Sequence, residues 1–338
     1  MSYFIELVIN GALIGLMYSM VALGIVLIYK SSGVLNFAAG AMVMMGGYVV
    51  WLLASWGLPI LLAIVLAVGV MFAFGLLTER LLLRTMVGQP VIMIVMLTLG
   101  LDIFLRGFGP GLLGTAPKHM ELGIDMAPII MGDILTNRTY VVGGVIAVIL
   151  IVAALLFFRT PLGTKLRAVS DDHVSSWSVG ISVEGAVAIS WGLAGICAVA
   201  AGTMWGAVQG VDWSLTALLF PAVAVVILGG IDSIPGALVG GLIVGILGSV
   251  IPGYVDSKVG GSTRDVVTSL VILLTSFGFV GVHIAHPVWM LAFLFLTALG
   301  FSLLGFILGL WARNFEQLQI VPMMVVTPLV FLGGAFYS

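Results

Sequence analysis

The chain has 338 residues, of which 62% are hydrophobic and only 8% are charged, and its formal net charge is −2. Soluble domains carry about 25% charged residues, so this composition excludes an ordinary soluble protein. The near-neutral charge excludes the basic surface that a nucleic-acid partner would need. The apolar runs are long and do not alternate, which argues against a membrane β-barrel. The sequence therefore predicts an all-α, polytopic membrane protein embedded in a lipid bilayer.

Apolar runs of about 20 residues predict membrane-crossing helices, because such a helix spans the hydrocarbon core of a bilayer. In chain order, we expect helices over residues 5–29, 34–54, 59–83, 90–108, 139–158, 185–209, 215–231, 234–252, 264–282, 288–311 and 318–336. The segments 215–231 and 234–252 are rich in glycine, which makes them candidates for broken or re-entrant helices. The count of hydrophobic segments is therefore about 8–11.

The distribution of basic residues predicts the orientation, because short cytoplasmic loops carry more Lys and Arg. If the N-terminus is periplasmic, six basic residues fall in the cytoplasm: Lys30, Arg80, Arg84, Arg159, Lys165 and Arg167. Over the first six predicted spans, only Arg106, Lys118 and Arg138 then lie outside. Residues 109–138 become an external loop. Glu79 and Arg80 fall near the inner end of their span, where long charged side chains are expected to snorkel toward water.

Residues 159–184 form a polar island in this hydrophobic chain, reading RTPLGTKLRAVSDDHVSSWSVGISVE. The orientation places this island in the cytoplasm, where charged residues indicate contact with a soluble partner. Asp171, Asp172 and His173 are consecutive, and such a run rarely closes a metal shell alone. We therefore interpret them as a solvated face and expect neither a metal nor another cofactor.

Two glycine clusters, at residues 31–47 and 229–245, each follow an apolar span and open another. They are compatible with two related halves, as in many transporters, and equally with tight packing between helices. Asn36 and Asp232 lie within these clusters. Polar groups at membrane depth are costly unless they face protein or water, which makes both residues functional candidates.

Three segments carry a family resemblance: SSGVLNFAAGAMVMMGGYV, TPLGTKLRAVSDDHVSSWSVGI and VAVVILGGIDSIPGALVGGLIVGIL. In this order and spacing they resemble branched-chain amino acid ABC transporter permeases of the high-affinity uptake type. The resemblance extends over about residues 1–275. It implies a permease subunit that moves a branched-chain amino acid, or a similar small polar solute such as an amide or urea, across the bacterial inner (plasma) membrane.

The resemblance also implies partners and a coupling loop. The partners are two ABC ATPase subunits, a second permease subunit, like or unlike, and a periplasmic solute-binding protein. The chain has no GxxxxGK[ST] motif for binding ATP, so we expect a transport subunit rather than an enzyme. The ATPase-coupling residues that the resemblance indicates are Gly163, Lys165, Leu166, Arg167, Ala168, Asp171, Asp172, Gly180 and Ile181.

The residues of the translocation path are harder to choose from sequence. The candidates are Asn36, Gly40, Thr98, Asp102, Gln209, Asp232, Pro235 and Gly236, with Arg106 and Asp212 as further candidates. Asp102 and Arg106 are four residues apart on one helical face, so their spacing predicts an ion pair within the membrane.

The C-terminal residues 276–338 resemble a different family. The pattern LWARNFEQLQ, followed by a proline and FLGGAFYS, resembles part of the type-2 ABC export permeases. We therefore expect two domains, an uptake-type permease over 1–275 and a partial export-type fragment over 276–338, as in a fused or mis-joined chain. The alternatives are an export permease for a drug or polysaccharide, an intramembrane enzyme and a passive channel. His283 and His286 in the connector do not by themselves predict a metal site.

Overall fold

The structure is a computed structural model that describes residues 2–86, 89–124, 127–131, 134–259, 261, 263–279 and 286–311. The chain divides into two compact units, Met1–Phe279 and Val280–Ser338. The predicted span 318–336 and the connector residue His283 lie outside the described residues.

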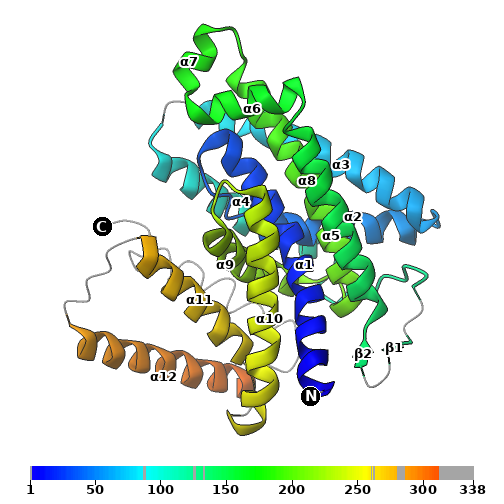
Figure 1. Cartoon of the computed structure of the whole chain (residues 1–338), viewed down its shortest axis with the longest axis vertical. Coiled ribbons are helices and arrows are strands. Elements are labelled where there is room, and N and C mark those ends of the chain that lie inside the picture. Colours follow the sequence, from blue (N-terminus) through cyan, green and yellow to red (C-terminus); the bar gives the residue numbers. More distant parts are fainter. Residues whose placement is uncertain are drawn as a thin grey trace. The chain divides into compact units, whose positions relative to one another are not determined.

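The first unit is a bundle of helices (Figure 1). Its apolar helices are α1 (Ser2–Ser32), α2 (Ala39–Ser55), α3 (Ile60–Leu81), α4 (Val91–Leu113), α5 (Arg138–Phe157), α8 (Val183–Gln209), α9 (Leu219–Gly229), α10 (Ile234–Val259) and α11 (Thr263–Phe279). Its short elements are α6 (Pro161–Asp171), α7 (His173–Ser178), the antiparallel strands β1 (Ile129–Met131) and β2 (Ile134–Thr136), and 3₁₀ segments at Leu83–Met86 and Trp213–Leu218. The second unit contributes α12 (Pro287–Trp311).

Seven helices of the described chain are long and apolar enough to cross a membrane, and α2 and residues 213–229 are shorter apolar helices. The prediction of a polytopic helical membrane protein is therefore confirmed. The described part of the second unit, α12, is apolar along its length. A helix that is hydrophobic all round is typical of a membrane span.

The core of the first unit lies around α1, which packs against α10, α8, α5 and α9. Glycines set how closely these helices approach. A Cβ atom on Gly15 of α1 would lie 2.2 Å from the carbonyl oxygen of Gly241 in α10. A Cβ atom on Gly195 of α8 would lie 2.3 Å from the carbonyl oxygen of Met71 in α3. Small residues let helix backbones meet where the bilayer supplies no hydrophobic driving force. Tight packing therefore accounts for these glycines.

The α2 helix begins at Ala39, whereas its apolar pattern predicts a start near residue 34. The Asn36 carboxamide oxygen accepts a hydrogen bond from the Ala38 amide at 2.9 Å, and Gly33 has a φ of +66°. Such side-chain turns compete with the helix. The first residues of the predicted span are consequently a non-helical turn, and this turn carries Asn36 into the protein.

The polar island folds mainly into α6 and α7. Thr160 caps α6 by accepting a hydrogen bond from the Gly163 amide at 3.3 Å, and Pro161 occupies the first turn. Leu166 and Val169 are buried, because they lie on the face toward α1 and α8. Figure 1 shows α6 and α7 at the end of the unit opposite to the N-terminus of α1. The island is therefore an ordered cap on one end of the bundle.

Candidate functional site: a polar seam and an exposed amphipathic helix

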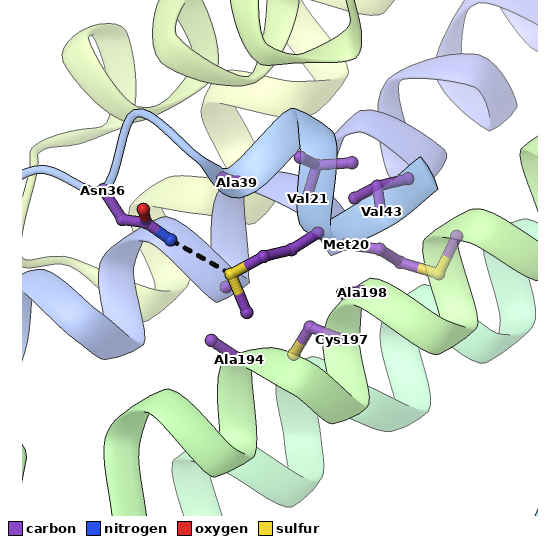
Figure 2. A pocket seen from close by; sticks show the side chains of 10 residues that line it. Met20, Val21, Asn36, Ala39, Val43, Ala194, Cys197 and Ala198 are labelled. Atoms are coloured by element: carbon purple, nitrogen blue, oxygen red, sulfur yellow. Dashed lines mark hydrogen bonds between the residues drawn. The ribbon is translucent and has the colours of Figure 1, made fainter. Parts of the chain in front are cut away.

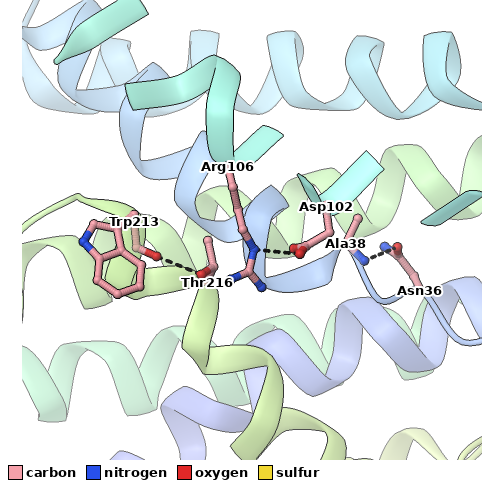
Figure 3. Close-up of polar contacts among 6 residues, drawn as sticks. All are labelled: Asn36, Ala38, Asp102, Arg106, Trp213 and Thr216. Atoms are coloured by element: carbon pink, nitrogen blue, oxygen red, sulfur yellow. Dashed lines mark hydrogen bonds and ion pairs between the residues drawn. The ribbon is translucent and has the colours of Figure 1, made fainter. Parts of the chain in front are cut away.

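A polar seam lies where α4 meets the turn before α2 (Figure 3). Asn36 and Thr98 are each 2% exposed. The Thr98 hydroxyl accepts a hydrogen bond from the Phe37 amide at 3.4 Å and donates one to the Val95 carbonyl at 2.8 Å. The turn before α2 is thus linked to α4 through the hydroxyl of Thr98.

Asp102 and Arg106 continue this seam along α4. The Arg106 Nε lies 2.6 Å from Asp102 Oδ2, with the arginine side chain 30% exposed and the aspartate side chain 9% exposed. The ion pair predicted from their spacing is therefore confirmed. The second carboxylate oxygen of Asp102 and the buried hydroxyl of Tyr48 have no hydrogen-bond partner among the described residues. These unsatisfied groups keep hydrogen-bonding capacity inside an apolar bundle.

Gly40 completes the seam by bringing α2 against the 3₁₀ segment Trp213–Leu218. A Cβ atom at Gly40 would lie 2.2 Å from the carbonyl oxygen of Thr216. Figure 3 shows Thr216 beside Arg106, with Asp102 and Asn36 farther along. Three separate parts of the sequence therefore bring polar groups to one place: the α2 turn, α4 and the 3₁₀ segment.

A small cavity lies behind Asn36 (Figure 2). The Asn36 carboxamide nitrogen donates to the Met42 sulfur at 3.3 Å, and Met20, Ala194 and Cys197 contribute to the walls. The cavity volume is about 10 Å³, which is near the minimum for a single water. An amino acid does not fit here unless the helices move.

Two other path candidates, Gln209 and Asp212, lie at and just after the C-terminal end of α8. Gln209 is exposed at the C-terminus of this helix. Asp212 caps the following 3₁₀ segment by accepting a hydrogen bond from the Ser214 amide at 2.9 Å. Next to them, Lys118 and Val211 exchange two backbone hydrogen bonds of 2.9 and 2.8 Å. The predicted external loop is therefore tied to the helices, and it contains a short β-hairpin that the sequence did not predict.

The remaining path candidates, Asp232, Pro235 and Gly236, lie at the corner between α9 and α10. The Asp232 carbonyl accepts a hydrogen bond from Lys30 Nζ at 2.9 Å. Asp232 and Pro235 line a pocket together with Arg159 and Arg167 of the polar island. The candidates chosen from sequence as one path thus fall into separate groups, of which this one adjoins the island.

The candidate coupling residues differ in exposure. Gly163 and Leu166 are buried, and Ala168 and Ile181 are half-buried. The exposed members are Lys165, Arg167, Asp171, Asp172 and Gly180. Trp177 and Val179 stand beside them, 74% and 79% exposed. Neither residue was predicted from sequence as part of the coupling loop, although a tryptophan in an otherwise polar segment favours contact with a partner.

Glu79 does not snorkel, so that expectation was wrong. Glu79 is only 4% exposed, and its Oε1 lies 3.8 Å from Arg84 Nε. Thr78 and Glu79 are buried while the next two residues, Arg80 and Leu81, are exposed, so the carboxylate lies on the side of α3 that faces protein. In the part of the chain that is described, no group of three His, Cys, Asp or Glu side chains could hold a metal ion.

Apolar spans, close glycine contacts and a buried polar seam define a multi-pass helical membrane protein of the kind that includes transport permeases. A family model described as the permease component of the branched-chain amino acid transport system matches residues 7–276. This match covers most of the sequence, and the chain belongs to this family.

Curated relatives agree with the family match. The high-affinity branched-chain amino acid transport system permease protein LivH of Salmonella typhimurium is 25% identical, over 80% of this chain and 92% of the relative. BraD of Pseudomonas aeruginosa is 28% identical, over 72% and 85%. The "Probable branched-chain amino acid transport permease protein LivH" of Methanocaldococcus jannaschii is 30% identical, over 80% and 89%.

The C-terminal part matches a second family. A model described as ABC-2 type transporter matches residues 254–338. The inner membrane transport permease YadH of Escherichia coli K12 is 38% identical over 89 residues, which is 26% of this chain and 34% of that relative. The two family matches share residues 254–276. By its packing against α9 and α10, α11 belongs to the first unit.

Proposed function

We propose that this chain is the permease subunit of an ABC importer for a branched-chain amino acid or a similar small polar solute. The family match over residues 7–276 carries this proposal. Separate ATPase subunits supply the energy, because the sequence lacks the phosphate-binding motif of an ATPase. The chain lies in the bacterial inner membrane with its N-terminus in the periplasm, as the basic residues predict.

The polar seam is our proposed contact for the solute. An amino acid in water carries one positive and one negative charge, and the pair Asp102–Arg106 presents one of each at 2.6 Å. Such a solute can bind both partners while the seam stays neutral, which limits the cost of burying charge in the membrane. Asn36 and Thr98 add neutral hydrogen-bonding groups to this seam.

The path requires helix movement, because the cavity beside Asn36 is too small for an amino acid. A subunit of the same or a different sequence can supply the facing half of the path. A periplasmic binding protein delivers the solute to the outer face. These partners follow from the proposed importer class.

The α6–α7 segment is our proposed ATPase contact. The exposed side chains Lys165, Arg167 and Asp171 can form charged contacts, while Trp177 offers an apolar anchor of the kind enriched at interface hot spots. The buried side chains Leu166 and Val169 attach α6 to the bundle. A displacement of α6 can therefore reach α1 and α8 directly.

Uptake of labelled leucine by proteoliposomes tests the proposal. The complete assembly should accumulate leucine only with ATP, and an ATPase subunit with an inactivated phosphate-binding loop should abolish accumulation. Flux that does not need ATP would favour a passive channel. Turnover of a peptide or lipid substrate by the chain alone would favour an intramembrane enzyme.

The ABC-2 match over residues 254–338 favours a second candidate function, export of a drug or polysaccharide. We rank it lower because the similarity covers about a third of the relative's length. Removing residues 280–338 leaves the first compact unit whole. We expect uptake to persist in this truncated chain. Loss of an export phenotype together with unchanged uptake would instead assign export to the removed segment.

A further inference from the structure

A basic pocket lies at the end of the bundle where α1 and α5 finish and α10 begins. It has a volume of about 460 Å³, within the size range of small-molecule sites. Three cationic residues line it, Lys30, Arg159 and Arg167. Lys30 is far in sequence from the two arginines, so the fold brings its positive charge to theirs.

Phe158 organises two of the three cations. Lys30 Nζ stands 5.7 Å from the centroid of the Phe158 ring, within the range of a cation–π contact. A guanidinium nitrogen of Arg167 lies 3.5 Å from the Phe158 carbonyl oxygen, where it donates a long hydrogen bond. The Lys30 ammonium also donates to the Asp232 carbonyl at 2.9 Å. Neutral groups thus hold both cations at the pocket.

The positive charge of the pocket is only partly neutralised by protein. In the described part of the chain, none of these three cations lies within ion-pair distance of a carboxylate. Asp232 is the acidic residue in the lining, which leaves a formal excess of two positive charges (three minus one). Leu155 and Phe158 supply apolar wall beside the cations. Charged and apolar surfaces therefore adjoin in one pocket.

We propose that this pocket binds the phosphate headgroup of an anionic phospholipid. Basic pockets between membrane helices near an interface favour anionic headgroups. The ends of α1 and α5 form part of this pocket, and a helix long enough to cross the bilayer ends near its headgroups. The apolar wall can cover the first part of an acyl chain. The binding itself does not depend on the transport assignment; only its placement in the cytoplasmic leaflet rests on the proposed orientation.

The test compares lipids and two matched double variants of the purified, delipidated full-length chain. Binding is measured with phosphatidylglycerol, with phosphatidylcholine and with inorganic phosphate. The first variant, R159Q/R167Q, removes two charges from the pocket. The control, R80Q/K165Q, removes two exposed charges that are not in its lining. Thermal unfolding without lipid checks that both variants fold.

We expect the full-length chain to bind phosphatidylglycerol in preference to phosphatidylcholine and inorganic phosphate. Each juxtamembrane charge contributes about fivefold to anionic-lipid affinity, so R159Q/R167Q should weaken binding by roughly 25-fold. R80Q/K165Q should stay within about twofold. Equal losses in both variants, no preference for phosphatidylglycerol, or equally strong binding of inorganic phosphate would each overturn the proposal. If R159Q/R167Q does not fold, K30Q replaces it, with K165Q as the single-charge control.

Discussion

The innermost helix of the first unit, α1, is less apolar than the outer helix α3, although more of its residues are buried. In an apolar 18-residue stretch of α1 the mean hydropathy is 2.3 and 83% of the residues are buried. In the corresponding stretch of Ile60–Met86, which contains α3, the mean hydropathy is 2.9 and 22% of the residues are buried. Lipid tails are as apolar as leucine, so burial between helices brings no hydrophobic gain. Close contact depends on small residues, which are also less hydropathic. The best-packed helix need not be the most apolar one.

The largest loss of unfolding free energy should come from placing a larger side chain in the contact between α1 and α10. In Gly15→Leu, the new side chain meets the backbone of Gly241, because a Cβ atom alone would lie 2.2 Å from that carbonyl oxygen. We expect a loss of at least about 3 kcal/mol in unfolding free energy, or no folded protein. Fluorescence-monitored unfolding in detergent measures this loss.

The matched control is Gly69→Leu in the outer helix α3, where no heavy atom of the described residues, apart from the helix's own neighbouring backbone, lies within 4 Å of the added Cβ. It should fold as well as the natural chain. If the two leucine substitutions cost the same, the distinction between inner and outer helices is wrong.

A smaller loss of unfolding free energy is expected from substitutions in the charged pair of α4, Asp102 and Arg106. Asp102→Asn leaves Arg106 without its partner at a site where the aspartate is 9% and the arginine 30% exposed. Because the arginine is partly exposed, we expect a loss of about 2 kcal/mol, below the range for fully buried pairs. Unfolding measurements on D102N, R106Q and the double variant separate the coupling energy. Losses that simply add would show that the pair is not coupled.

The smallest effect should come from the outer face of α3. Leu61 is 76% exposed, so Leu61→Ala removes few protein contacts and should change the unfolding free energy by less than about 0.5 kcal/mol. The same detergent-based unfolding assay applies. A loss above about 1.5 kcal/mol would show that this face is covered by part of the protein.

The apolar helices were predictable from the sequence, because a helix that crosses the bilayer needs about 20 consecutive apolar residues. The α5 helix, for example, was expected over 139–158 and is observed over Arg138–Phe157. The local structure was predicted wrongly where one side chain decides it. Asn36 delays the start of α2 through its own hydrogen bond, and Glu79 is buried near the C-terminal end of α3.

The candidate site was predictable only where spacing along one helix determines contact. The pair Asp102–Arg106 needed only the helical repeat. Whether Asp232 and Pro235 lie near Asn36 depends on how distant segments pack, which the sequence does not show. In the structure they lie beside Arg159 and Arg167. No local pattern in the sequence records which helix ends meet in space.

The proposal that α6 transmits energy from the ATPase to the bundle is tested most directly by the number of leucine molecules transported per ATP hydrolysed. In K165Q/D171N, both altered side chains are exposed and lie outside the basic pocket, so the chain should fold normally. We predict that the reconstituted assembly still hydrolyses ATP while uptake falls at least about tenfold, because contact energy at the interface is lost. An unchanged ratio of leucine to ATP in this variant would contradict the assignment of α6 as the coupling element.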